Sequence, residues 1–182
     1  YLNSAAYGSG NTQNADLISP QFDFTGFTDV TLSFKYFFRY YTGSSGKVYY
    51  SLNNGGTWVL LAQFTSLSAT NPSLFSQLIP ALAGQSQVRF KWNYTGTFGF
   101  YWAIDDVSLN GTTANTLAVT PSSQGVSSLA GIANYSISTN ASWTASSNAT
   151  WCVPTTSGNG SATLTTNYSE NLSVDTRNAN IT

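Results

Sequence analysis

This chain of 182 residues has no histidine, one cysteine and few charged side chains. Without histidine it can form neither a Ser-His-Asp triad nor a metal centre with histidine ligands. The single Cys152 excludes a disulfide within the chain, and its position between Trp151 and Val153 favours a buried apolar thiol. Six basic residues and a net charge of −1 give no basic surface for nucleic acid.

Long apolar segments are also missing. No run approaches the length of a membrane-spanning helix, and no charged segment followed by an apolar one opens the chain. We therefore expect no membrane span. The alternating, strand-like pattern of residues 178–182 leads us to expect a region cut from a longer precursor that carries further domains.

What the chain does contain is typical of β-structure. Hydrophobic residues make up 41% and aromatic residues 15%, enough to bury a core in one large or two small domains. Asn, Ser, Thr and Gly replace the usual charged residues, and they favour strands and turns over helices. Alternation of apolar and polar residues predicts strands at 32–40, 48–52, 58–62 and 88–94, with a hairpin turn at 53–56.

A domain boundary is expected after residue 112, because the aromatic content falls there and charge almost disappears. The predicted domains are 1–112 and 113–182. Short strand candidates in the second domain are spaced roughly 8–12 residues apart, as in a small sandwich. They lie at 117–120, 135–138, 143–145, 151–153 and 162–166.

Two adjacent carboxylates, Asp105 and Asp106, lie inside an apolar strand, where aspartate is disfavoured and an unpaired carboxylate is costly. The alternation also changes phase here, because Ile104 would lie on the face opposite Val107. A β-bulge at the pair would resolve this and turn at least one carboxylate sideways.

Adjacent strand residues point to opposite faces, so the pair would not flank a glycosidic bond at the separation of about 5 Å that hydrolysis needs. No catalytic residue is predicted.

The basic residues are placed in pairs on strand faces. Lys35 and Arg39 share one face, and Arg89 and Lys91 share another. If the two strands are neighbours, these residues and Tyr41 form a basic patch suited to sulfated or uronic glycans. The alternative is a solvated sheet face whose charges prevent association of sheet edges.

The first domain resembles the MAM-like jelly-roll modules of secreted bacterial proteins, of the cleaved-adhesin and choice-of-anchor type. The resemblance covers nearly all of residues 1–110. It rests on Leu17-Ile18-Ser19-Pro20, Phe22-Asp23-Phe24, Leu32-Ser33-Phe34, Ser51-Leu52-Asn53-Asn54-Gly55-Gly56-Thr57-Trp58, Val88-Arg89-Phe90 and Trp102-Ala103-Ile104-Asp105-Asp106-Val107.

The second domain resembles a BACON domain, an immunoglobulin-like module, over about residues 116–182, without the final strand. The matching residues are Asn140-Ala141-Ser142-Trp143-Thr144, Ala149-Thr150-Trp151-Cys152, Ser157-Gly158-Asn159-Gly160, Asn171 and Arg177-Asn178-Ala179-Asn180-Ile181. Together the resemblances imply an all-β chain: a jelly-roll β-sandwich followed by a smaller, C-terminally incomplete immunoglobulin-like sandwich.

The first resemblance also implies a structural calcium ion between the last strand and the N-terminal segment. Its ligands would be Asp105 or Asp106 with Asp16, Asn14 and nearby backbone carbonyls, an oxygen set that suits Ca²⁺. The alternative is that the two aspartates accept backbone N–H bonds and cap loops.

Two classes of function follow for this extracellular or cell-surface bacterial chain. The first is a non-catalytic adhesion or carbohydrate-binding region that meets a glycan or another cell-surface ligand. The second is a structural spacer or fibre-forming module that assembles through its incomplete second sandwich, since an incomplete sandwich exposes strand edges.

Overall fold

The computed structural model describes residues 2–3, 10–97 and 99–182, and it is an all-β structure with one short 3₁₀ turn. None of the described residues belongs to a helix with the length and apolarity needed to cross a membrane. The chain divides into two compact units, Tyr1–Ala114 (unit 1) and Asn115–Thr182 (unit 2). This division falls after the predicted boundary at residue 112 because the last strand of unit 1 continues to Thr113.

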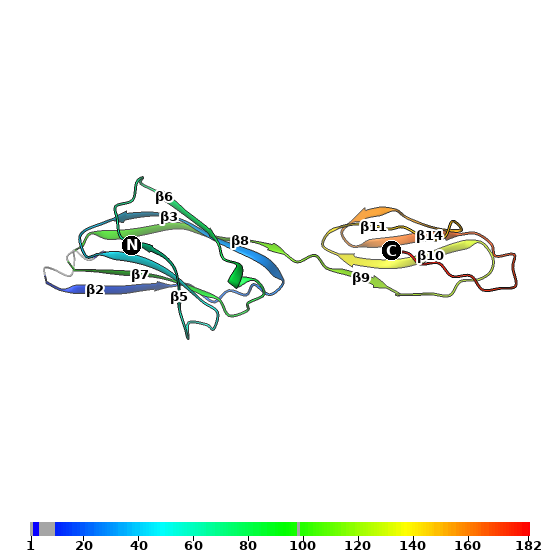
Figure 1. Ribbon diagram of the computed structural model, residues 1–182, viewed down its shortest axis with the longest axis horizontal. Helices are drawn as coiled ribbons and strands as arrows, with labels where there is room; N and C mark the ends of the chain where they lie inside the picture. Colours follow the sequence, from blue (N-terminus) through cyan, green and yellow to red (C-terminus); the bar gives the residue numbers. More distant parts are fainter. Residues whose placement is uncertain (1, 4–9, 98) are drawn as a thin grey trace. The chain divides into compact units, whose positions relative to one another are not determined.

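Unit 1 consists of two four-stranded antiparallel sheets (Figure 1). The first sheet has the order β1-β8-β3-β6, with β1 at Leu2–Asn3, β3 at Phe27–Arg39, β6 at Ser73–Leu78 and β8 at Tyr101–Thr113. The second has the order β2-β7-β4-β5, with β2 at Thr12–Ile18, β4 at Ser45–Ser51, β5 at Val59–Phe64 and β7 at Arg89–Thr97.

The inward faces of the two sheets form one aromatic core. The ring of Phe34 on β3 meets that of Trp92 on β7 edge to face, with centroids 5.8 Å apart, and Phe38 meets Tyr94 at 6.1 Å. These four side chains and Trp102 are almost completely buried. Inward residues alternate with outward ones along β3 and β7, so the polar residues between them lie on the outer faces of the sandwich. The predicted β-sandwich is confirmed.

The predicted hairpin turn is also present. Asn54 and Gly55 have φ angles of 56° and 95°, and the Gly56 N–H donates to the Asn53 carbonyl. Two strands of unit 1 carry too few core residues to be recognised by alternation. In β6, Phe75 packs on the core while Leu74 and Leu78 are exposed, and β2 is an edge strand made mostly of polar residues.

Unit 2 has a four-stranded sheet in the order β12-β14-β10-β9 and a two-stranded sheet, β11-β13. The bounds are β9 Leu117–Thr120, β10 Gly131–Thr139, β11 Ser142–Thr144, β12 Cys152–Pro154, β13 Ser157–Asn159 and β14 Ala162–Tyr168. The C-terminal residues pair with the segment around Ser147 through an isolated bridge to Ile181. The short β13 was not predicted, because Ser157-Gly158-Asn159 reads as a turn.

Candidate functional site

The Asp105-Asp106 pair forms the predicted β-bulge. Between the pairs Lys35↔Asp105 and Ser33↔Ser108, β8 contains one residue more than β3. Asp106 has a φ of 48°, in the left-handed region, and its N–H donates to the Asp105 carboxylate at 2.8 Å. This is the backbone N–H bond expected under the alternative reading of the pair.

The bulge changes the direction of the following side chains. Ile104 before it and Leu109 after it both pack on the core, as the change of phase requires. Val107, which the same argument placed in the core, is instead 48% exposed, because it belongs to the part of the bulge where β8 departs from regular pairing.

Asp106 is held on the outer face by Lys35, whose ammonium lies 2.8 Å from its carboxylate. This hydrogen bond, strengthened by the Coulombic attraction to Asp106, raises the pKa of Lys35 above its ordinary value. Both side chains are more than half exposed, so the pair orders the bulge without adding much to the stability of the fold.

The four predicted calcium ligands do not come together. Asp105 and Asp106 belong to β8 in the first sheet, whereas Asn14 and Asp16 belong to β2 in the second. Asn93 on β7 donates one bond to Asn14 and another to Asp16, each at 2.7 Å, so these two oxygens already have a partner. Within residues 10–97 and 99–182 there is no cluster of three or more His, Cys, Asp or Glu side chains that could hold a metal. The four-residue set therefore does not fit a single ion.

The predicted basic patch is likewise divided. Lys35 and Arg39 lie on β3, and Arg89 and Lys91 lie on β7 of the other sheet. The condition that the two strands be neighbours is not met, because alternation gives the face of each residue but not the order of the strands. Tyr41 follows β3 and therefore stays with Arg39.

Arg39 is the centre of an exposed aromatic cluster at the end of β3. Its guanidinium carbon lies 4.1 Å from the centre of the Phe100 ring, and Tyr41 meets Phe100 edge to face at 5.8 Å. Tyr101 lies across from Arg39 on β8 and packs against Phe37 at 6.0 Å. We call these five residues the Arg39 site.

The Arg39 site is accessible and locally ordered. Tyr41 is 45% exposed and Phe100 is 37% exposed. A tight turn fixes the backbone of Tyr41: the Ser44 N–H donates to the Tyr41 carbonyl, and Gly43 supplies the required positive φ of 84°. The buried Ser44 hydroxyl also accepts from the Tyr41 N–H and donates to its carbonyl. The turn thus fixes the backbone from which the Tyr41 side chain projects.

Arg89 and Lys91, the second basic pair, already interact with neighbouring residues of unit 1. The Lys91 ammonium lies 4.8 Å from the centre of the Tyr49 ring, 4.7 Å from that of Trp58 and 3.8 Å from the Asp16 carboxylate. Its side chain is only 16% exposed. The Arg89 guanidinium donates to the Asn54 side chain at 2.6 Å and to the Ser19 carbonyl at 3.2 Å.

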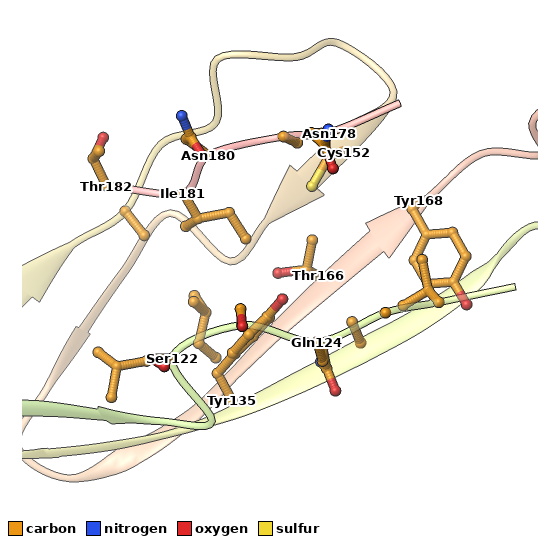
Figure 2. A pocket seen from close by; sticks show the side chains of 18 of the residues that line it. Ser122, Gln124, Tyr135, Cys152, Thr166, Tyr168, Asn178, Asn180, Ile181 and Thr182 are labelled. Carbon is orange, nitrogen blue, oxygen red and sulfur yellow. The ribbon is translucent and has the colours of Figure 1, made fainter. Parts of the chain in front are cut away.

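Unit 2 contains a cavity of about 570 Å³ that is lined by residues of both its sheets (Figure 2). Apolar residues of β9, β10 and β14 form its floor, and the segment 176–182 lies across it. The hydroxyl of Thr166, which is 2% exposed, lines the cavity without a partner among the described residues. The buried Cys152, which forms no disulfide, also lines it. The cavity has the volume of many ligand sites, but it coincides with an incompletely filled core.

Sequence reasoning missed Phe100, the residue on which Arg39 stacks. Phe100 precedes β8 and follows Gly99, so it belongs to no alternating segment. The available signal was local: the run Gly99-Phe100-Tyr101 places an aromatic pair next to the strand that was expected to contain the two aspartates.

A comparison with protein families agrees with this fold. Residues 41–110 match the family model described as Reelin subrepeat B. The match covers less than half of the chain, lies within unit 1 and includes Tyr41, Phe100 and Tyr101. It indicates an extracellular-type β-sandwich module. It confirms neither the MAM-like nor the BACON-like assignment, and no curated protein matches the chain.

Proposed function

We propose that the chain is a non-catalytic, extracellular glycan-binding region and that unit 1 binds its glycan at the Arg39 site. One observation carries the proposal: Arg39 is exposed, lies over the Phe100 ring that Tyr41 also contacts, and takes part in neither of the two ion pairs of the described residues. A guanidinium and phenol rings held on a rigid sheet suit sugars, which offer both polar hydroxyls and apolar C–H faces.

The location of the site agrees with this role. It lies where β3 ends and β8 begins, so both strands and the Tyr41–Ser44 turn position its side chains. Sites built on sheet strands hold their geometry without help from the ligand, which limits the entropy lost on binding. The match to an extracellular-type module supports a ligand at the cell surface or in the matrix.

A glycan array with purified protein tests the proposal. We expect specific binding to a subset of glycans, and Tyr41→Ala should weaken it by about fivefold or more, because a ring contact contributes about 1 kcal/mol. The matched control is Leu74→Ala, which removes an exposed apolar side chain from β6, in the sheet that contains Arg39.

Two results would refute the proposal. One is a folded protein that binds no glycan, which would favour a structural spacer. The other is binding that Leu74→Ala weakens as much as Tyr41→Ala, which would indicate nonspecific adhesion to apolar surface.

A further inference from the structure

We infer that the Arg39 site recognises one carboxylate group of an acidic sugar, such as a uronic or sialic acid, rather than a sulfated chain or a neutral glycan. This inference rests on the proposed glycan-binding function and specifies its ligand. It follows from the number of cations in unit 1 that are available to bind a ligand and from the geometry of Arg39.

Three other cations of unit 1 already have partners. Lys35, on the same outer face, is paired with Asp106 at 2.8 Å. Lys91 is enclosed by two rings and Asp16, and Arg89 by Asn54 and Ser19. These two lie on β7, in the other sheet.

Lys47 is the remaining cation of unit 1, and it also lies in the other sheet, on β4. The site therefore offers a single positive charge. Chains that carry many sulfate groups need several cations in a row, because each contact with one exposed charge is weak and screened by salt.

Arg39 has the side-chain geometry that suits a carboxylate. A guanidinium is planar and presents paired N–H donors that match the two oxygens of a carboxylate. In this site the guanidinium carbon lies 4.1 Å from the centre of the Phe100 ring and the residue is exposed, so N–H donors stay available for a planar acceptor. An arginine stacked in this way loses less rotational freedom on binding than a free one.

The rings next to Arg39 would contact the rest of the sugar. Tyr41 is 45% exposed and meets Phe100, the ring over which Arg39 lies, at nearly a right angle of 89°. A pyranose whose carboxylate reaches Arg39 can lay its C–H face on Tyr41. A neutral sugar would leave the Arg39 charge without an anionic partner, whereas a carboxylate can accept both N–H bonds of its fork.

The test compares ligands that carry different acidic groups, and it includes an acid with its own uncharged ester. Isothermal titration with trigalacturonic acid, its methyl ester and 3′-sialyllactose separates the two sources of carboxylate, and a heparin tetrasaccharide represents sulfated chains. We expect at least one carboxylated sugar to bind, and esterification of the uronate or Arg39→Gln to weaken that binding by about tenfold or more. Arg39→Lys should restore little of it, because lysine keeps the charge and loses the fork.

The control is Lys47→Gln, which removes the same charge from the other sheet and should leave binding unchanged. Circular dichroism and the melting temperature check that each variant is folded.

The inference is overturned if the methyl ester binds as well as the acid, if Lys47→Gln weakens binding as much as Arg39→Gln, or if heparin binds most tightly. Tyr41-dependent binding of neutral sugars alone would leave the proposed function intact and refute the carboxylate. Absence of binding to any glycan would refute both.

Discussion

Lys35 and Arg39 are on the same face of one strand, and their surroundings give them different roles. Lys35 has an acidic partner on the neighbouring strand, whereas Arg39 lies opposite Tyr101 and stacks on Phe100. Alternation along the strand predicted their shared face. It could not predict their partners, since these lie on β8 or just before it, more than sixty positions later in the chain.

The Lys35 ion pair gives a pH dependence with a defined sign. Because Asp106 raises the pKa of Lys35 in the folded state, the pair stabilises the fold below the ordinary lysine pKa, and this contribution is lost as the pH rises through the folded-state pKa. We expect an NMR titration of the Lys35 side chain to show a pKa above that of free lysine, and Asp106→Asn to lower it. A Lys35 pKa that is the same in both proteins would contradict the ion pair.

At the scale of the element, the β-bulge is the clearest success of sequence reasoning. The change of phase between Ile104 and Leu109 required an extra residue, and the structure has it at this position. Neither the left-handed backbone of Asp106 nor the exposure of Val107 followed from alternation, because both depend on how the bulge relaxes against β3.

The left-handed backbone makes a prediction about stability. We expect Asp106→Gly to be more stable than Asp106→Ala by about 1 kcal/mol, because a Cβ atom is strained at positive φ. Both variants lack the carboxylate, so the comparison isolates the backbone. In a regular strand the order is reversed, with glycine less stable than alanine. Urea unfolding measures the difference, and an alanine variant as stable as the glycine variant would contradict the bulge geometry.

At the scale of the whole molecule, the two units have separate cores. The sequence predicted two β-sandwich units from the change in composition and the regular turn spacing. The order of strands in each sheet was not predictable, because it depends on long-range pairing that local patterns do not encode. For this reason the predicted basic patch and the predicted calcium ligands are each divided between two sheets.

Calcium binding by Asp105 and Asp106 alone stays a prediction, and it concerns unit 1 only. An ion at this pair would compete with Lys35 for Asp106 and would lack Asn14 and Asp16, so we expect weak binding. Calorimetry should show that millimolar Ca²⁺ raises the melting temperature of unit 1, more strongly in Lys35→Gln than in the original protein, and that EDTA reverses the effect. Asp105→Ala should abolish it. Identical melting curves in all these conditions would show that Asp105 and Asp106 do not bind calcium.

The central claim is that unit 1 binds an acidic glycan through Arg39. The most direct measurement is titration calorimetry of the original protein and Arg39→Gln with a carboxylated oligosaccharide and its methyl ester. We expect the acid to bind the original protein. Either Arg39→Gln or esterification of the carboxylate should weaken this binding about tenfold or more. The two changes together should cause little further loss of affinity. Equal affinities for acid and ester, or additive losses in the double change, would contradict it.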